Sequence, residues 1–341
     1  MATLKDVAKL ANVDVSTVSR ALNNTSYVHP ETKKRVFAAA RELSYQPNLM
    51  AKALKQGRKN AIGIVVPDLR LTVFSDITRA MIQEASNRGY VALISVSNDD
   101  PAIEREALLR LKAGFVDALA IAPTNKNTSV LIDMYESGFP IVQMVRRQVK
   151  TIPSVISNHF ASGHDAVEFF YKKGCRKIAF IDGPLTLSPY LERYKGYMSA
   201  IHEFGLEPLC YEIEEFEGRL AHYEYGYEGT KKLFATEPDI DALLVAVDLQ
   251  GIAAIRALKE IGKKVPEEVM IISLTGNSLG DILETKMSAF ETLSQSMGKQ
   301  IVTMLIDAVE NSGSLLESNQ QMIFDYKLVE RETTRPSTSK S

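Results

Sequence analysis

TLKDVAKLANVDVSTVSRALNN, residues 3–24, is the stretch that decides the fold. The apolar residues of its first half recur at the i, i+3, i+4, i+7 spacing of one helical face: Leu4, Val7, Ala8 and Ala11. Thr3 is placed to cap this helix, with Asp6 at the capping-box position. Asn12 tolerates the left-handed backbone of a tight turn, and Asp14 can cap a second helix. The stretch therefore predicts two short helices joined by a tight turn.

The second predicted helix has two faces of opposite character. We expect its apolar stripe to be buried: Val15, Val18 and Leu22. The opposite face carries short polar side chains around one arginine: Ser16, Ser19, Arg20 and Asn23. His29 and Pro30 mark the start of a third helix, whose apolar stripe is Val36, Ala39, Ala40 and Leu43. Such an arrangement is typical of a helix-turn-helix unit, which lays its second helix in the major groove of DNA.

Charge is distributed unevenly along the chain. The first 59 residues contain 11 Lys and Arg but only four Asp and Glu, whereas the whole chain has a net charge of −2. A basic first segment on an acidic remainder favours a polyanion as the partner of the first segment. A solvated helical cap without a ligand is the alternative that the residues alone leave open.

Residues 48–57 predict a short hinge helix. Pro47 stops the preceding helix, and Gly57 can end the new one. A helix of about two turns is marginal in water, so we expect it to form only against a partner. Met50 and Leu54 share one face and offer an apolar pair for insertion into the minor groove of DNA, and Lys52 and Lys55 can reach phosphates. A plain linker is the alternative reading of this segment.

The remaining ~270 residues are long enough for two lobes of ordinary domain size. Apolar runs that read as buried strands alternate with helical patterns. The first series has strands at 62–66, 91–96, 116–122 and 141–145, with helices such as 75–88 and 102–112. The second has strands near 177–181, 242–247 and 269–274, with helices near 161–172, 190–204, 223–234 and 249–261. This alternation predicts an α/β fold: two doubly wound parallel-sheet lobes that bind ligands at the carboxyl ends of their strands.

The run 3–24, followed by ETKKRVFAAARELSYQPNLMAKALKQG at 31–57, resembles the head and hinge of the lactose-repressor (LacI/GalR) family. The resemblance implies base contacts from Val15, Ser16 and Arg20. Arg20 can pair bidentately with guanine, whereas Val15 offers only an apolar contact. The resemblance also implies a minor-groove wedge at Leu54 and phosphate contacts from Thr3, Thr17, Asn23 and Tyr45.

The rest of the chain resembles the periplasmic-binding-protein-like core of the same family. GPLTLSPYLERYKGY, residues 183–197, carries Arg193 at the position where the family's arginine grips the effector. VDLQGIAAIRAL, residues 247–258, puts Asp248 on the family's acidic position at a strand end. KLVERETT, residues 327–334, looks like the family's closing strand.

The resemblance also implies the domain boundaries. We expect a helix-turn-helix head at 1–47, a hinge helix and linker at 48–58, and a core at 59–335. The chain is expected to cross between the lobes near residues 158, 288 and 322. The N-lobe would then hold about 59–158 plus 289–321, and the C-lobe about 159–288 plus 322–335.

The effector cleft departs from the family pattern. Where the family usually reads GYDD or GYDN, this chain has SLTGN at 273–277, so Thr275 replaces the cleft aspartate or Asn277 is displaced into its place. The chain contains no Trp, so any ring that stacks on an effector comes from Tyr or Phe. We take Phe74, Tyr190 and Tyr223 as the candidates.

Two further cleft candidates are Arg146 and Asn158. Arg146 would suit an anionic or hydroxyl-rich effector. The residues alone leave plainer roles open: a surface ion pair for Arg193, a helix cap for Asp248, a solvated loop for Arg146 and a core position for Phe74.

Motifs for catalysis or metal binding are missing. Cys175 and Cys210 are far apart, and the five His residues show no metal-ligand spacing. No Walker loop, GxSxG elbow or GxGxxG turn occurs. We therefore expect no enzyme, no cofactor and no metal. No signal peptide or membrane span is evident, so we expect a cytoplasmic protein.

These observations predict a sequence-specific transcriptional regulator, a repressor of a carbohydrate-utilisation operon controlled by a sugar or phosphosugar between the lobes. The chain stops soon after the closing strand, so we expect a homodimer on a near-palindromic operator rather than a tetramer. One alternative keeps the DNA function with a nucleobase, phosphosugar or phosphocarrier protein as effector. Another is a cytosolic solute-binding protein without specific DNA binding.

Overall fold

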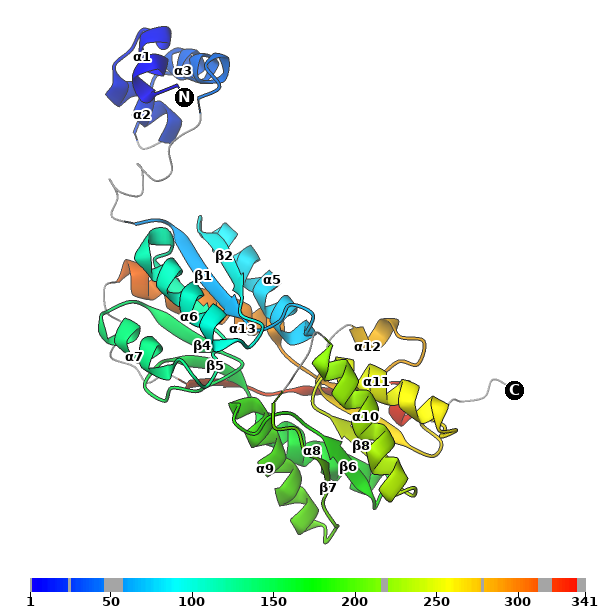
Figure 1. Ribbon diagram of the computed structural model, residues 1–341. Helices are drawn as coiled ribbons and strands as arrows, with labels where there is room; N and C mark the ends of the chain where they lie inside the picture. Colours follow the sequence, from blue (N-terminus) through cyan, green and yellow to red (C-terminus); the bar gives the residue numbers. More distant parts are fainter. Residues whose placement is uncertain are drawn as a thin grey trace. The chain divides into compact units, whose positions relative to one another are not determined.

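The structure is a computed structural model that describes residues 2–23, 26–45, 58–215, 220–276, 279–311 and 321–335. The chain divides into two compact units, Met1–Lys59 and Asn60–Ser341. The first is all-helical, and the second contains two parallel-type sheets covered by helices (Figure 1). The expected fold class is therefore confirmed.

The first unit contains the three expected helices: α1 (Leu4–Ala11), α2 (Val15–Asn23) and α3 (Pro30–Glu42). Thr3 and Asp6 form the predicted capping box, because the Thr3 side chain accepts from the Asp6 amide while the Asp6 carboxylate accepts from the Thr3 amide. Asn12 has the left-handed backbone that the turn requires, with φ of 52°. The local chemistry of the sequence thus fixes both ends of α1.

One small apolar core holds the three helices together. Its buried members are Val7, Ala8, Ala11, Val18, Ala21, Val36 and Ala39. The prediction that Val15 is buried was wrong, because its side chain is 40% exposed. The buried stripe of α2 instead continues from Val18 to Ala21 and the half-buried Leu22, and Val15 in the first turn lies beyond the start of that stripe.

The N-lobe of the second unit is built on a six-stranded sheet whose neighbouring strands are all parallel. In spatial order the strands are β11 (Gln321–Phe324), β5 (Ser154–Ser157), β4 (Ile141–Met144), β3 (Ala118–Ile121), β1 (Ala61–Val66) and β2 (Val91–Val96). β1 is buried along its whole length because helices cover both faces of the sheet.

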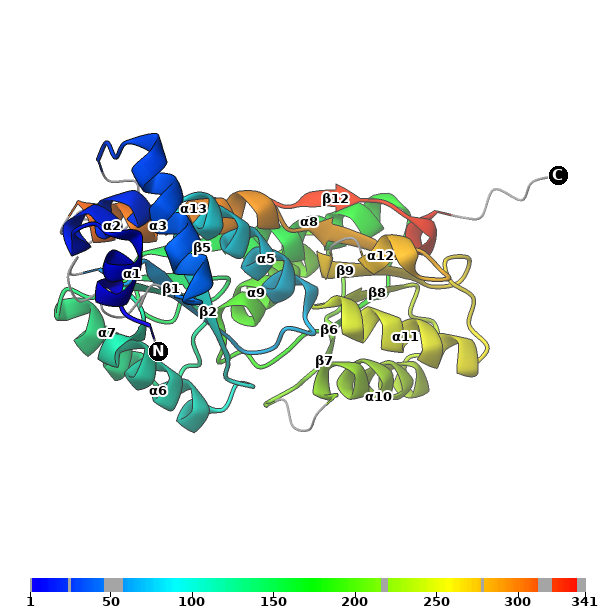
Figure 2. The same ribbon diagram turned by 90° about the horizontal axis from the view of Figure 1, so that it is seen from above.

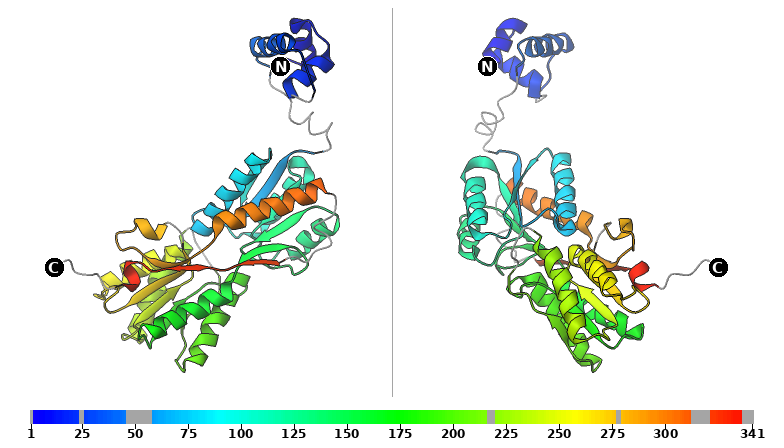
Figure 3. Two further views of the ribbon diagram at one scale, coloured as in Figure 1. Left: turned by 180° about the vertical axis from the view of Figure 1, so that it is seen from behind. Right: turned by 45° about the vertical axis from the view of Figure 1, so that its right-hand side comes forward.

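Four helices and a short π-helical turn cover this sheet. One face carries α5 (Thr72–Asn87) and α13 (Ser294–Glu310), which lie side by side in both views of Figure 3. The other face carries α6 (Pro101–Arg110), the turn η1 (Leu111–Phe115) and α7 (Thr128–Glu136). Successive residues of β1 point to opposite faces, so they contribute alternately to two apolar cores.

The C-lobe repeats this plan. Its strands in spatial order are β12 (Lys327–Val329), β10 (Ser288–Glu291), β9 (Met270–Gly276), β8 (Ala242–Val245), β6 (Ile178–Ile181) and β7 (Leu209–Tyr211). One face carries α8 (His159–Lys172) and α9 (Ser188–Glu203), and the other carries α10 (Ala221–Thr236) and α11 (Asp248–Glu260). Figure 2 shows the helices of the second unit divided between these two lobes.

The sequence predicted a wholly parallel sheet in the C-lobe, but one strand pair of this sheet is antiparallel. β12 pairs with β10 in the antiparallel direction. β12 follows β11 after only two residues, so there is no crossover helix to turn the chain back before it enters the second sheet. The expected closing strand is accordingly short, and it leads into a 3-10 turn, η2 (Glu332–Thr334).

The chain moves between the two sheets three times. The changes follow β5, β10 and β11, thus after residues 157, 291 and 324. The last two changes come a few residues later than the predicted crossings near 288 and 322. The reason is that β10 pairs with β9 inside the C-lobe sheet, and β11 pairs with β5 inside the N-lobe sheet.

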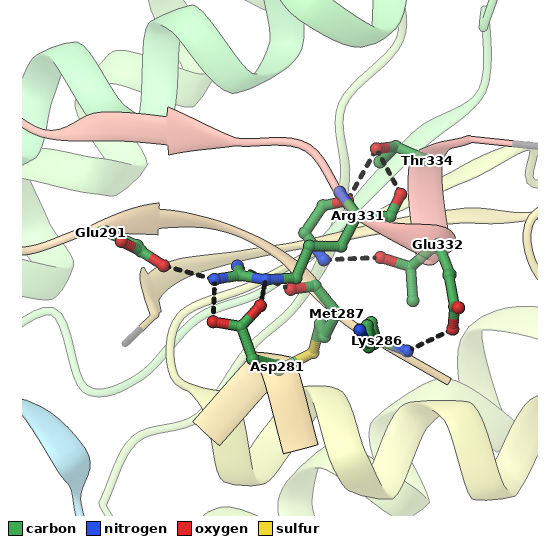
Figure 4. Close-up of polar contacts among 9 residues, drawn as sticks. Asp281, Lys286, Met287, Glu291, Arg331, Glu332 and Thr334 are labelled. Carbon is green, nitrogen blue, oxygen red and sulfur yellow. Dashed lines mark hydrogen bonds and ion pairs between the residues drawn. The ribbon is translucent and has the colours of Figure 1, made fainter. Parts of the chain in front are cut away.

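Arg331 fastens the end of the core to the C-lobe (Figure 4). Its Nε and Nη2 donate to the two carboxylate oxygens of Asp281 at 2.6 and 3.0 Å, and Nη2 also donates to Glu291 at 2.5 Å. Asp281 lies in the short helix α12 (Leu279–Ile282). The Arg331 amide donates to Ser288 Oγ at 2.7 Å. Arg331 thus joins the end of the core to α12 through its side chain and to β10 through both its side chain and its amide.

Candidate nucleic-acid interface and inter-lobe ligand site

The polar face of α2 is available to a partner. Ser16, Arg20 and Asn23 are exposed. The Arg20 guanidinium donates to the Ser16 carbonyl at 3.3 Å and to Thr17 Oγ1 at 3.4 Å. The Asn23 amide donates to the Ser19 carbonyl at 3.0 Å. Because these hydrogen bonds stay within α2, the donors can be redirected to base edges without breaking contacts between helices.

The other predicted DNA contacts fall into three groups. Thr3 is exposed at the start of α1, and Val15 is exposed at the start of α2. Tyr45 is half-buried against the helical core, and its amide donates to the Ala40 carbonyl at 2.8 Å. Met50, Lys52, Leu54 and Lys55 lie outside the described residues.

Three residues with positive φ mark loops at the edge of the N-lobe sheet. They are Asn98 and Asp99 after β2, with φ of 54° and 57°, and Val145 after β4, with φ of 63°. This backbone region is costly for a β-branched residue such as Val145, and such residues concentrate at ligand sites. Here the two turns present Asp99 and Arg146 to each other.

Arg146 and Asp99 form a bidentate ion pair. The Arg146 side chain is almost fully buried, and its Nη2 donates to Asp99 at 2.9 Å while Nη1 donates to the other carboxylate oxygen. Burial opposes ionisation of Asp99, but the guanidinium charge and its hydrogen bonds outweigh burial and lower the pKa of Asp99. The guanidinium also lies 5.8 Å from the ring centre of Phe74. Phe74 is 3% exposed and belongs to the N-lobe core.

Arg193 is the centre of a second buried cluster. It lies on α9 and is 2% exposed. Its Nη2 donates to Thr275 Oγ1 at 2.5 Å and lies 3.3 Å from His159 Nδ1, and its Nη1 donates to the Ala246 carbonyl at 3.4 Å. The predicted pair Arg193 and Thr275 is therefore brought together. The Tyr190 ring lies on one side of this cluster, and its centre is 5.9 Å from the Arg193 guanidinium carbon.

His159 is neutral and orients this cluster. Its Nε2 lies 3.1 Å from the Val145 carbonyl, which can only accept, so Nε2 carries the proton. Nδ1 therefore accepts from the hydroxyl of Tyr326 at 2.7 Å. Burial, reinforced by the charge of Arg193, lowers the pKa of His159 well below its ordinary value. The ring thus ties the end of β4 in the N-lobe to the start of α8 in the C-lobe.

Further hydrogen bonds join the lobes around these clusters. Thr72 Oγ1 on α5 donates to Asp248 on α11 at 3.1 Å, and the Arg147 amide donates to Ser188 Oγ on α9 at 2.8 Å. Asp248 is 3% exposed, so the predicted acidic residue lies between the lobes. A cavity of about 260 Å³ has walls from both lobes: Asp99, Thr124 and Lys126 from one, Pro184, Thr186 and Glu215 from the other.

Two predicted effector residues lie apart from these clusters. Asn158 caps α8 by accepting from the Ala161 amide at 3.2 Å, and its side-chain amide donates to Asp325 at 3.1 Å. Tyr223 accepts from Arg256 at 3.2 Å on the outer pair of helices α10 and α11. Its neighbour His222 is half-buried, and desolvation of the imidazole lowers its pKa to about 4.

Five residues that the fold brings near the cleft were not among the predicted effector residues: Asp99, His159, Asp182, His222 and Tyr326. Asp182 directly follows a run that reads as a strand, and Asp99 comes three residues after another such run, so their placement was an available signal. The other three converge from distant parts of the chain. Among the described residues no group of three or more His, Cys, Asp or Glu side chains could hold a metal ion. Of the described helices, none is long and apolar enough to span a membrane.

A two-lobed binding core and a helix-turn-helix unit in one chain define a ligand-binding transcriptional regulator as the class of protein. Residues 3–48 match the model of the bacterial regulatory proteins of the lacI family, and residues 59–330 match that of the periplasmic binding proteins and sugar binding domain of the LacI family. The chain belongs to the LacI family of transcriptional regulators, which is not a family of enzymes.

Individual relatives agree with this assignment over nearly the whole length. The ribose operon repressor of Halalkalibacterium halodurans is 31% identical over 98% of each chain. The HTH-type transcriptional repressor PurR of Klebsiella pneumoniae strain 342 is 29% identical over 97% of this chain and 96% of its own. The crystal structure of the lac repressor dimer bound to operator and the anti-inducer ONPF matches 98% of this chain and 99% of its own, with a TM-score of 0.84 at 24% identity.

Proposed function

We propose that this DNA-binding repressor controls a carbohydrate-utilisation operon and that a small hydroxyl-bearing effector, bound between the lobes, changes its affinity for a near-palindromic operator. The observation that carries the proposal is the buried Arg193 cluster at the junction of the two lobes. A molecule bound there would touch both lobes and so favour one lobe arrangement over another.

The DNA part of the proposal rests on α2. Ser16 and Arg20 are the proposed readers of base edges, with Val15 as an apolar contact. Thr3, Thr17, Asn23 and Tyr45 are the proposed phosphate contacts. A homodimer would present two such helices to the two halves of an operator, as the dimeric lac repressor does in its operator complex.

A sugar is the effector class that the cleft supports best. The buried Phe74 ring is covered by Arg146, so it is not free to stack on a nucleobase. Arg146 is already neutralised by Asp99, which weakens the case for an anionic effector. The resemblance to a ribose operon repressor supports a sugar, whereas the resemblance to PurR keeps purines in the test.

The test has two stages. Selection from randomised duplexes at moderate salt should enrich one inverted-repeat sequence, and footprinting should show protection of both halves. The enriched duplex is then titrated in the presence of single sugars, sugar phosphates and purine bases. A change in operator affinity with a sugar supports the proposal. No enrichment of any sequence, or a response to purines alone, would refute it.

A further inference from the structure

Asp182 is a buried carboxylate that the fold leaves unsatisfied. It follows β6 directly, at the carboxyl end of a central strand of the C-lobe sheet, and is 6% exposed. The adjacent Gly183 amide lies near the carboxylate without reaching hydrogen-bond geometry, and among the described residues neither carboxylate oxygen has another partner. Burial raises the pKa of Asp182 well above its ordinary value, and the charge of Arg193 and the Gly183 amide oppose this shift without reversing it.

The backbone at Asp182 is held in place. The Gln250 side-chain amide donates to the Asp182 carbonyl at 2.7 Å, while the Gln250 oxygen accepts from the amides of Ala246 and Val247. A Cβ added to Gly183 would lie 2.7 Å from the Tyr190 ring, so this segment packs closely against that ring. The carboxylate is therefore not on a loop that can simply turn it out to solvent.

Arg193 carries the complementary unsatisfied donor. Its two terminal nitrogens are engaged by Thr275, His159, Tyr326 and the Ala246 carbonyl. Its Nε is buried and has no hydrogen-bond partner among the described residues. An unsatisfied donor and two unsatisfied acceptors thus belong to neighbouring side chains, although buried polar groups are almost always paired.

The described end of β9 has Thr275 beside Arg193 and no carboxylate, which makes the nearby carboxylate of Asp182 important. Residues 273–277 contain no aspartate, and Thr275 Oγ1 already accepts from Arg193. The Thr275 oxygen is therefore already engaged as an acceptor, and the end of β9 supplies no carboxylate among the described residues. Asp182, at the end of β6, is a buried carboxylate on another strand, and it lies within the electrostatic influence of the same arginine.

We propose that Asp182 and Arg193 Nε form a subsite for a neutral polyol, in which one hydroxyl accepts from Nε and two adjacent hydroxyls donate to the two oxygens of Asp182. This inference rests on the proposed function and specifies the class of its effector. A hydroxyl fits because it both donates and accepts. A phosphate only accepts when fully ionised, and its charge would repel the carboxylate. The group at this subsite is therefore unphosphorylated.

Space for such a molecule lies beside the carboxylate. A cavity of about 470 Å³ is lined by Asp182, Gly183, Thr186, Tyr194, Tyr211 and Glu212, among others. This volume falls in the range of about 300–1,000 Å³ of small-molecule sites. Thr186 also lines the cavity between the lobes, so the two cavities adjoin. Both oxygens of Asp182 are shielded from solvent, so a hydroxyl reaches them only when the surrounding loops or lobes separate.

The test uses the full chain, with calorimetric titration of named probes. The neutral probes are D-ribose, D-xylose, D-glucose and sucrose, and the charged probes are ribose 5-phosphate and glucose 6-phosphate. For a neutral sugar that binds the wild type, Asp182→Asn should weaken affinity on the order of 10- to 100-fold, the effect of losing hydrogen bonds to a charged group. Asp133→Asn is the matched control, because Asp133 is an exposed aspartate on α7 that lines neither cavity.

Deoxy sugars make the test independent of folding defects. A probe that lacks one hydroxyl of the diol should bind the wild type more weakly than its parent, whereas both should bind Asp182→Asn alike. The proposal is overturned if Asp182→Asn binds the parent sugar normally, if only phosphorylated probes bind, or if no neutral probe binds. If the wild type still binds one operator sequence selectively, these results overturn the Asp182 subsite alone. If it does not, the proposed function itself has failed.

Discussion

At the residue scale, Asp182 illustrates how burial sets the ionisation of a carboxyl group. In the unfolded chain this group titrates near its ordinary value, whereas burial raises its pKa in the folded state. The folded state thus binds a proton more tightly than the unfolded state. Its contribution to stability is complete below the unfolded pKa and is lost as pH rises through the folded pKa.

Asp182→Asn should therefore be more stable than the wild type at neutral pH in the absence of effector. The difference should shrink as pH falls from the raised folded pKa toward the unfolded pKa of about 4, with a slope of at most about 1.4 kcal/mol per pH unit for the one proton involved. The groups nearby that titrate or carry charge are Arg193, Tyr190 and Cys210. Urea unfolding of both proteins between pH 4 and 8 measures the difference. A variant that loses stability equally at every pH would show that the carboxylate is satisfied in the native state.

Arg20 is the residue whose loss should affect sequence preference most. Arg20→Ala should lower discrimination at one base pair of each half-site by about 1–3 kcal/mol, because a bidentate pair with guanine would be lost. Binding to random duplexes should fall much less. Competition between the selected duplex and single-base variants provides the measurement. Arg41→Ala on α3 is the control, since a phosphate contact there would weaken all duplexes alike. A uniform loss with Arg20→Ala would remove Arg20 from base reading.

At the element scale, the short closing strand β12 depends on side chains for its attachment. It pairs with β10 over only three residues. The Arg331 side chain, which is 6% exposed, supplies ion pairs to α12 and β10 that so short a ladder does not provide. Glu332 adds a contact by accepting from the Lys286 amide at 2.8 Å.

Arg331→Leu should lower the free energy of unfolding by roughly 2–3 kcal/mol, the range of charged hydrogen bonds. The loss should remain moderate because Asp281 is more than half exposed and can be hydrated once its partner is gone. Thermal unfolding of the full chain measures the change. Arg335→Leu, whose only ion pair given by the structure is a 3.8 Å contact with Glu330, is the comparison. Equal effects of the two substitutions would contradict the special role of Arg331.

At the scale of the whole molecule, the architecture could be predicted from the sequence because it depends largely on interactions between residues close together in the chain. The capping box of Thr3, the left-handed Asn12 and the alternation of apolar runs with helical segments each depend on neighbours in the chain. The predictions were wrong where contacts between distant parts of the chain determine the burial of a residue or the position of a strand. Val15 fits a helical stripe by spacing alone, but no element covers it. β10 and β12 are three- or four-residue strands without a clear periodic signal.

The candidate site was predicted less completely than the fold. Arg193 and Thr275 were selected, and the structure brings them within hydrogen-bond distance. Asp182 was overlooked, because an Asp after an apolar run is usually a solvated loop residue, and only the fold shows that it is buried without a partner. His159 and Tyr326 are 167 residues apart, so no spacing rule could have paired them.

We propose that the relative arrangement of the two lobes links effector binding to operator binding. His159 joins the lobes through the Val145 carbonyl and also contacts Arg193 through its other nitrogen. A molecule that engages Arg193 would therefore act on a contact between the lobes, and its different affinities for two lobe arrangements would set the size of the response.

Operator titration of wild type and Arg193→Ala, with and without a sugar that binds the wild type, tests this link most directly. We expect the two proteins to bind the selected operator equally well without sugar. Sugar should then change the operator affinity of the wild type by 5- to 150-fold, the ordinary range of about 1–3 kcal/mol for allosteric coupling, and leave Arg193→Ala unaffected. A normal sugar response from Arg193→Ala would contradict the account.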